Sequence, residues 1–463
     1  MNKTLTLALL LLAAWWGAAL AKPKKEAYPG GKFYIYRLSL TDKKGSLGSI
    51  NHPGTFLSDR ALKRRARQHL TVDSTDLPVS GTYLNTLRKQ GAQVVGMSKW
   101  NNTVLVRATD TTIMAKLARL AFVKQVRRVF QAPDSASVLT PEKISSTLGN
   151  DKVTGDIYGE GARQIDMLGG RQLHNAGYRG QGMLIAVIDG GFMNADKLAP
   201  RYHFNIVGQH DCVWPYNADI YQLLNHGTMV LSTMGAHADS AFVGTAPEAS
   251  YLLLRSEDGR SEQEVEEDYW AQAAEYADSA GADVINTSLG YTRFDNRGTS
   301  HRYSEQDGRT ALISRTASML ASKGIVMVCS AGNEGAGTWK RIGFPADARH
   351  CLTVAALSAD SVIAMFSSVG PAYDGRVKPD VAALGVAATV VGGNGIITAA
   401  NGTSFASPIL CGMVACLWQA LPNKTAGDII TLVRQSANRF TQPDNVYGYG
   451  IPNFYKAWLN GKQ

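Results

Sequence analysis

Cysteine is scarce in this chain, and the few cysteines are widely scattered. The 463 residues contain five of them, namely Cys212, Cys329, Cys351, Cys411 and Cys416. This excludes a disulfide-rich scaffold and a cysteine-ligated zinc site. Cys329 and Cys351 fall on two predicted strands of one sheet, and export would permit a disulfide between them. Cys411 and Cys416 lie in an apolar helix and are expected to be buried thiols, not nucleophiles.

Long apolar runs are absent after the first twenty residues. Lys3, the apolar run 5–20 and the Ala-Leu-Ala sequence at 19–21 are typical of a secretory signal peptide with its cleavage site. Residues 1–21 are therefore predicted to be removed, so that the mature chain begins near Lys22. No later stretch is expected to be long and apolar enough to cross a bilayer. The protein is predicted to be exported, as a secreted or periplasmic protein without a membrane span.

Acidic residues are few in the front part of the chain. Residues 22–130 contain 21 Lys and Arg against 6 Asp and Glu, a net charge of +15, whereas the residues after 130 carry −7. The densest basic run, 63–67, lies on an expected helix without interleaved aromatic residues, so no nucleic-acid partner is predicted. The basic face is expected either to be solvated or to dock on the acidic remainder.

The front part has the pattern of a small α+β domain. Strands are predicted at 33–40, 92–97, 103–108 and 123–130, and helices at 56–68, 82–90 and 111–121. The β-α-β-β-α-β order is that of a ferredoxin-like domain, assigned here to residues 22–130. Residues 131–160 show no periodicity and are predicted to be an exposed linker, which is a natural site for a maturation cut.

From residue 161 to the end, continuous apolar strands alternate with helices. Strands are predicted at 183–188, 249–254, 283–288, 325–329 and 351–357. One helix is predicted to start at a capping box, Ser261 to Glu264, and to end at Gly281; another spans 310–323. This alternation predicts a three-layer α/β domain with a mostly parallel sheet covered on both faces. Ligands bind such sheets at the carboxyl ends of the strands.

Four candidate catalytic residues lie at strand ends or helix starts, where such a sheet would form its binding site. Asp189 directly follows a strand, Asn333 follows another, His226 precedes Gly227 at a helix start, and Ser404 opens the apolar helix. Taken singly, each has an ordinary structural interpretation as a turn residue, a structural histidine, a loop residue or a helix cap. Together they supply a nucleophile, a base, an orienting carboxylate and an amide donor.

The stretches around these residues carry a family resemblance. They are Val-Ile-Asp-Gly (187–190), His-Gly-Thr-Met-Val (226–230), Thr-Ser-Leu-Gly (287–290), Ala-Gly-Asn-Glu-Gly (331–335) and Gly-Thr-Ser-Phe-Ala-Ser-Pro (402–408). Their order, Asp, His, Asn, Ser, resembles that of the subtilisin-like serine peptidases, the subtilases of peptidase family S8.

The resemblance implies a role for each residue. Ser404 would attack a peptide carbonyl to form an acyl-enzyme, His226 would be its base and Asp189 would orient the imidazole. Asn333 would donate to the oxyanion. Ser288, Leu289 and Gly290 would pair with the substrate backbone.

The resemblance also implies a zymogen, a secreted serine endopeptidase whose partners are protein or peptide substrates and its own prodomain, residues 22–130. An extra domain retained after export is the alternative for that segment. Calcium is common in the family, but no site is assigned here, since the candidates are equally well explained as turn and solvent residues: Asp211, Asp219, Asp374 and Asp380. The chemistry itself requires no cofactor.

Two other functions are compatible with this resemblance. An esterase would use the same triad, because acyl transfer is the shared chemistry. A subtilase-fold binding protein without activity is the alternative from another class. The joint presence of Asp189, His226, Asn333 and Ser404 argues against loss of activity.

Overall fold

The computed structural model describes residues 25–138, 140–146, 152–215 and 219–462. The predicted signal peptide lies outside the described residues, as does part of the predicted linker. The described chain forms an N-terminal four-stranded sheet, a central seven-stranded sheet and three two-stranded pairings.

The N-terminal sheet has the ferredoxin-like strand order that the sequence predicts. Its strands pair antiparallel in the order β3-β4-β2-β5. The elements of this part are β1 (Lys25–Glu26), β2 (Tyr34–Leu40), α1 (Asp59–Arg67), α2 (Gly81–Lys89), β3 (Gln93–Ser98), β4 (Thr103–Ala108), α3 (Thr112–Leu117), β5 (Val123–Gln131) and β6 (Ala136–Ser137). Helices α2 and α3 cover one face through Leu84, Leu87, Met114 and Leu117. Helix α3 is shorter than the predicted 111–121.

The larger sheet is parallel throughout, in the order β15-β14-β13-β12-β7-β11-β8. Its strands are β7 (Leu184–Asp189), β8 (Ile206–Asp211), β11 (Ser250–Arg255), β12 (Val284–Thr287), β13 (Val326–Ser330), β14 (Leu352–Leu357) and β15 (Val381–Leu384). Two hairpins accompany it, β9 (His237–Ala238) with β10 (Phe242–Val243), and β16 (Ala388–Val391) with β17 (Ile397–Ala400).

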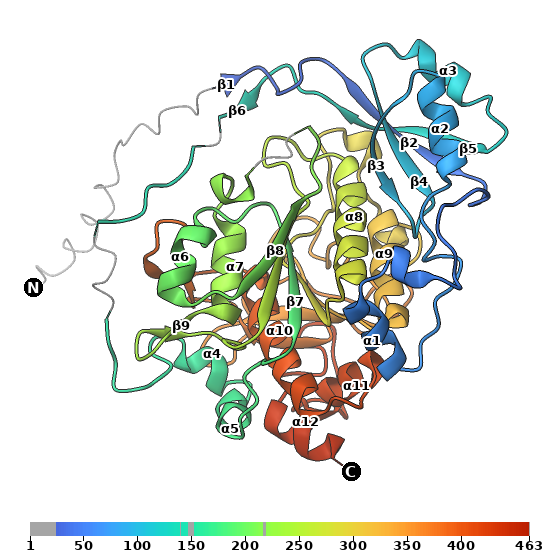
Figure 1. Ribbon diagram of the computed structural model, residues 1–463. Helices are drawn as coiled ribbons and strands as arrows, with labels where there is room; N and C mark the ends of the chain where they lie inside the picture. The colour runs from blue at the N-terminus through green and yellow to red at the C-terminus, as the bar shows by residue number, and fades with distance from the viewer. Residues whose placement is uncertain (1–24, 139, 147–151, 216–218, 463) are drawn as a thin grey trace, which may run out of the picture.

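Helices cover both faces of this sheet, which gives the three layers that the sequence predicts (Figure 1). They are α4 (Ala162–Asp166), α5 (Gly170–Asn175), α6 (Ala195–Tyr202), α7 (His226–Gly235), α8 (Val265–Ala280), α9 (Leu312–Met319), α10 (Thr403–Ala420), α11 (Ala426–Ser436) and α12 (Phe454–Gly461). The side chains of β7 alternate between the layers. Ile185 and Val187 share a core with α7 and α10, whereas Ala186 and Ile188 share one with α8 and α9.

Several elements differ from the sequence prediction. Helix α8 begins at Val265 and its N-cap, Glu264, makes no side-chain capping bond, so the predicted capping box at Ser261 is wrong. The edge strands β8 and β15 were not predicted. Strand β8 is only partly buried and lacks an apolar run, and β15 has four residues, so neither produces a strong periodic signal.

Helix α10 corrects the expectation that no stretch after the signal region could cross a bilayer. By length and composition alone it could, and it is the one such helix among the described residues. In this fold α10 is almost entirely buried, packed between α7 and strands β12 to β15. The helix is apolar because the hydrophobic core surrounds it on nearly all sides.

The permitted disulfide is absent: all five cysteines lie in described segments and all are free. The Cys329 thiol donates to the Ser330 carbonyl at 3.3 Å, and the Cys351 thiol to that of Ala348 at 3.2 Å. Burial raises the pKa of the Cys329 and Cys411 thiols well above the usual value, which argues against a thiolate nucleophile at these positions.

The basic helix α1 docks on the acidic part of the protein, which decides between the two interpretations of the basic run. Arg64 and Arg65 reach the Asp278 carboxylate of α8 at 2.6 and 2.9 Å, and Lys99 reaches it at 3.4 Å. The Arg64 and Asp278 side chains are 1% and 0% exposed. Gln68, just after α1, donates to the Gly324 carbonyl and accepts from the Ala426 amide.

Replacing Asp278 by alanine should destabilise the precursor by about 3–5 kcal/mol, because buried Arg64 would lose its counter-charge, whereas Arg65 keeps its pair with Asp76. The free energy of unfolding in urea, measured on precursor that cannot cleave itself, tests this. The matched control is Asp134→Ala, which removes the exposed pair with Lys32 (3.2 Å, both side chains 88% exposed) and should change nothing measurable. Equal effects of the two changes would contradict the anchoring role of Asp278.

Candidate active site

The end of the central strand β7 and the start of α7 form one hydrogen-bonded pair. Asp189, 1% exposed, is the last residue of β7, and His226 is the first of α7. The His226 Nδ1 lies 2.9 and 3.0 Å from the two Asp189 carboxylate oxygens. The Gly190 amide donates to Oδ1 of the same carboxylate at 2.8 Å. Because Nδ1 donates to a carboxylate, Nε2 is the ring nitrogen that can accept a proton.

The glycine after His226 allows α7 to approach the end of β7. The Gly227 amide donates to the Gly191 carbonyl at 3.0 Å. A Cβ at position 227 would lie 2.3 Å from that carbonyl oxygen, a distance that no side chain tolerates. The His-Gly pair of the sequence is thus a packing requirement that fixes where the imidazole stands.

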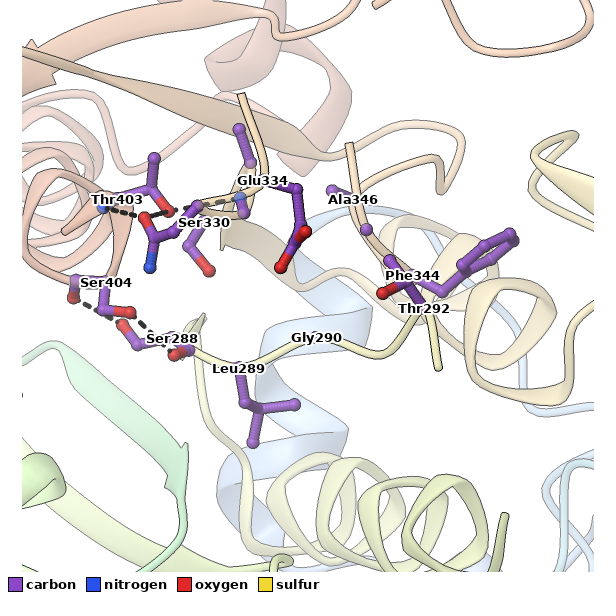
Figure 2. Close-up of a pocket in the computed structure, with 14 residues that line it drawn as sticks. Ser288, Leu289, Gly290, Thr292, Ser330, Glu334, Phe344, Ala346, Thr403 and Ser404 are labelled. Atoms are coloured by element: carbon purple, nitrogen blue, oxygen red, sulfur yellow. Dashed lines mark hydrogen bonds between the residues drawn. The ribbon is translucent and has the colours of Figure 1, made fainter. Parts of the chain in front are cut away.

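Ser404 lies in the first turn of α10 and is 9% exposed. Its hydroxyl donates to the Ser288 carbonyl at 3.1 Å, and the Ser288 hydroxyl donates to the Ser404 carbonyl at 2.8 Å (Figure 2). Within the described residues no hydrogen bond joins Ser404 to His226, whose ring instead contacts that of Phe405 at 5.8 Å between centroids. A rotation of the Ser404 side chain would exchange the Ser288 partner for another.

Asn333 is attached to the same helix start through Thr403. Its side-chain oxygen accepts from the Thr403 amide and from the Thr403 hydroxyl, both at 3.0 Å. The Thr403 hydroxyl in turn accepts from the Gly332 amide at 3.2 Å. These bonds occupy the oxygen of the Asn333 amide, which leaves its NH₂ group as a donor.

A pocket of about 190 Å³ opens beside these residues. It is lined by Ser288, Leu289, Gly290, Thr292, Ser330, Ala331, Gly332, Asn333, Glu334, Gly343, Phe344, Ala346, Thr403 and Ser404. Glu334 is the one ionisable residue in this lining, and Figure 2 shows its carboxylate turned into the pocket. The pocket therefore combines small-residue walls, backbone groups and a single negative charge, all within reach of Ser404.

The electrostatics around His226 favour its charged form. Burial lowers the pKa of His226, but the charge of Asp189, the hydrogen bond to it and the charge of Glu257 together raise this pKa above the usual value. An imidazole held in this way can accept a proton near neutral pH and is stabilised as a cation by Asp189.

The four acidic residues considered for calcium have other partners. Asp211 pairs with Arg255, Asp374 with Arg349 and Arg376, and Asp219 caps a short 3-10 helix. Asp380 is buried between Lys378 and Arg434, so its interpretation as a turn or solvent residue is wrong. In the described part of the chain no group of three or more candidate ligand side chains could hold a metal ion.

The predicted residues lie near the carboxyl ends of the central strands of the sheet. Asp189 and His226 are in direct contact, Ser404 contacts Ser288, and Asn333 contacts the residue before Ser404. Leu289 and Gly290 line the same pocket. Sequence reasoning missed the parts played by Thr403 and Glu334, although both stand inside the quoted stretches; hydrogen-bond partners and pocket walls are not visible in a motif.

Two family models match this chain. Residues 180–450 match the subtilase family, and residues 35–143 match the peptidase S8 propeptide domain of Bacteroidota. Subtilisin NAT from Bacillus subtilis subsp. natto is 31% identical over 288 residues, which cover 62% of this chain and 68% of the relative. Subtilisin from Bacillus pumilus is 30% identical (62% and 94% covered), and serine protease AprX from Bacillus subtilis (strain 168) is 29% identical over 304 residues (59% and 65%).

The subtilase match at 180–450 covers more than half of the chain. It includes Asp189, His226, Asn333, the pocket and the first turn of α10. The propeptide match at 35–143 covers most of the ferredoxin-like sheet and helix α1, which docks on the peptidase domain. The chain therefore belongs to the subtilase family of peptidase S8, as a serine-type endopeptidase that carries its own propeptide domain.

Proposed function

We propose that Ser404 is the nucleophile of this peptidase, that His226 is its general base and that Asp189 orients the imidazole. The observation that carries the proposal is the contact of both Asp189 oxygens with Nδ1 of His226, which makes Nε2 the proton acceptor. In the reaction, the Ser404 hydroxyl turns from the Ser288 carbonyl to Nε2. Exchanging one such hydrogen bond for another costs about 1 kcal/mol or less.

The chemistry then follows that of a serine peptidase. The Ser404 oxygen forms a bond to the peptide carbonyl carbon while its proton passes to Nε2 of His226. His226 next gives this proton to the leaving amine as the C–N bond breaks, which leaves an acyl-enzyme on Ser404. Water, deprotonated by the same imidazole, hydrolyses the ester and restores the serine.

Asn333 and the backbone of Ser404 would stabilise the negative oxygen of the tetrahedral intermediate. The Asn333 oxygen is already occupied by two bonds from Thr403, so its NH₂ group remains as a donor. The Ser404 amide lies in the first turn of α10, where backbone N–H groups have no partner within the helix. Ser288, Leu289 and Gly290 would pair with the substrate backbone along the same pocket.

Replacing Asn333 by alanine should lower kcat by about 10²- to 10³-fold with little change in KM, because the lost donor acts mainly in the transition state. Steady-state kinetics on a peptide substrate measures both constants. Thr403→Ser keeps the hydroxyl that holds the amide and should stay close to wild type. A rise in KM at unchanged kcat would show that Asn333 only binds substrate.

We also propose that the propeptide domain is cut away within residues 131–160 after export through the signal peptide at 1–21. Two contacts anchor the connecting segment to the peptidase domain. Gln131 and Gln263 exchange hydrogen bonds of 2.9 and 3.0 Å. Glu142 accepts from Asn194 at 2.9 Å and from Asn225, the residue before His226, at 2.5 Å. At Glu142 the segment therefore passes beside the residue that precedes the proposed base.

Incubation of purified precursor, followed by intact-mass measurement, tests this account of maturation. Wild type should release a fragment that ends between residues 131 and 160 and should gain activity on an unfolded protein substrate. A precursor that is fully active while uncut, or that is cut only outside this segment, would contradict it.

A further inference from the structure

Glu257 lies beside the Asp189–His226 pair, although no stretch of the family resemblance includes it. Strand β11 pairs in register with β7, so that Arg255 stands opposite Asp189. The next amide, of Ser256, donates to the Asp189 carbonyl at 3.0 Å. Glu257 follows and is partly buried.

The Glu257 carboxyl extends over the backbone that follows Asp189. One of its oxygens lies 3.2 Å from the place that a Cβ on Gly190 would take. Leu224 lies 2.9 Å from the same place, so Gly190 leaves room for both neighbours. The loop after β11 thus directs a second carboxyl group toward the site already occupied by Asp189 and His226.

Charged and titratable groups face Glu257 from each neighbouring element. They are Asp189 of β7, His226 of α7, Arg255 of β11, Tyr291 after β12, and Glu262 and Glu266 around the start of α8. The pKa of Glu257 is raised to about 7 overall. Burial and the charge of Asp189 raise it, and His226, Tyr291 and Arg255 offset part of that rise. Arg255 also pairs with Asp211 at 3.0 Å.

We propose that Glu257 is a positioning residue of the active site, a second carboxylate that acts through His226 by stabilising the imidazolium formed when Ser404 attacks. This inference rests on the proposed function. The proton that leaves Ser404 still goes to Nε2 of His226; Glu257 neither accepts it nor touches substrate.

The expected pH dependence follows from the signs of these interactions. The imidazole must be neutral to act as a base, so activity falls as the pH drops through the pKa of His226. Ionised Glu257 raises the pKa of His226. Removing its charge lowers that pKa, so the acid limb of the pH profile should move to lower pH, most clearly above about pH 7, where Glu257 itself is ionised. The same removal withdraws support from the transition state, so kcat on the alkaline plateau should fall by about tenfold or less, since nucleophile and base remain.

Glu257→Gln in the mature enzyme tests this, with kcat and kcat/KM measured against pH on an uncharged peptide. The acid limb should shift to lower pH and the plateau kcat should fall, while Glu257→Asp, which keeps the charge, should restore most of both. Glu262→Gln is the matched control: this exposed carboxyl responds to the charges of Glu257 and Asp295, and its removal should change the profile far less than Glu257→Gln.

Titration of active enzyme with a fluorophosphonate separates the possible failures. If wild type and Glu257→Gln are both labelled and their pH profiles superimpose, the role of Glu257 is overturned while the serine mechanism stands. A shift of equal size in Glu262→Gln would likewise overturn it, because the effect would then be that of general surface charge. Failure of wild type itself to be labelled would instead overturn the proposed function.

Discussion

Ser404→Ala should leave the precursor uncut and lower kcat for peptide hydrolysis by about 10⁶-fold, the scale known for the nucleophile of subtilisin, a relative of this chain. The proposed mechanism needs the Ser404 oxygen as the atom that becomes acylated. Its hydroxyl otherwise makes one hydrogen bond, to the Ser288 carbonyl, so the fold should survive the change. Intact mass after incubation reports cleavage, and a peptide assay on chain freed of its propeptide reports kcat.

Ser407→Ala is the matched control for this change. Ser407 lies one turn along α10, is fully buried and donates to Asn286 at 2.8 Å. Its loss should cost stability, about 1–3 kcal/mol for a buried partner left unpaired, and should leave the precursor able to cut itself. Self-cleavage by Ser404→Ala at a rate within tenfold of wild type would show that another residue is the nucleophile.

Asp189→Asn should lower kcat by about 10⁴-fold while the protein stays folded. An amide at position 189 would present an N–H to Nδ1 of His226, so the imidazole would take the tautomer with its proton on Nε2. That nitrogen could then no longer accept the proton of Ser404. Steady-state kinetics near neutral pH, together with a circular dichroism spectrum that matches wild type, measures the effect.

Asp211→Asn serves as the control for Asp189→Asn. Asp211 ends the edge strand β8 and pairs with Arg255 at 3.0 Å. This change should lower stability and affect kcat far less than Asp189→Asn. A loss of less than tenfold in Asp189→Asn would mean that the 2.9 Å contact with His226 does not orient the base.

The sequence predicts the layers of this fold well where residues are buried on both sides. Strand β7 is buried on both faces by helices, so its sequence is a nearly continuous apolar run that is easily recognised as a strand. Strand β8 at the sheet edge is half exposed, mixes polar and apolar residues and was missed. The predicted N-cap of α8, Ser261, lies three residues before the observed one, Glu264, because Ser261 and Glu264 have the spacing of a capping box without making its bonds.

Some residues of the candidate site could be predicted from the sequence and others could not. Asp189, His226, Asn333 and Ser404 are marked by short stretches in which glycine neighbours are needed for close backbone approach, as at Gly227. Glu257 has no such mark, because its position depends on the register of β11 against β7. The docking of α1 on Asp278 likewise joins residues more than 200 positions apart, and only the charge difference between the two parts of the chain indicated it.

The most direct test of the central claim is to label the processed enzyme with a fluorophosphonate and to locate the adduct by peptide mapping. The account predicts one adduct, on Ser404, formed in parallel with loss of peptidase activity and absent from Ser404→Ala. An adduct on a different residue that accompanies inactivation, or full peptidase activity in an enzyme that the reagent does not modify, would contradict it.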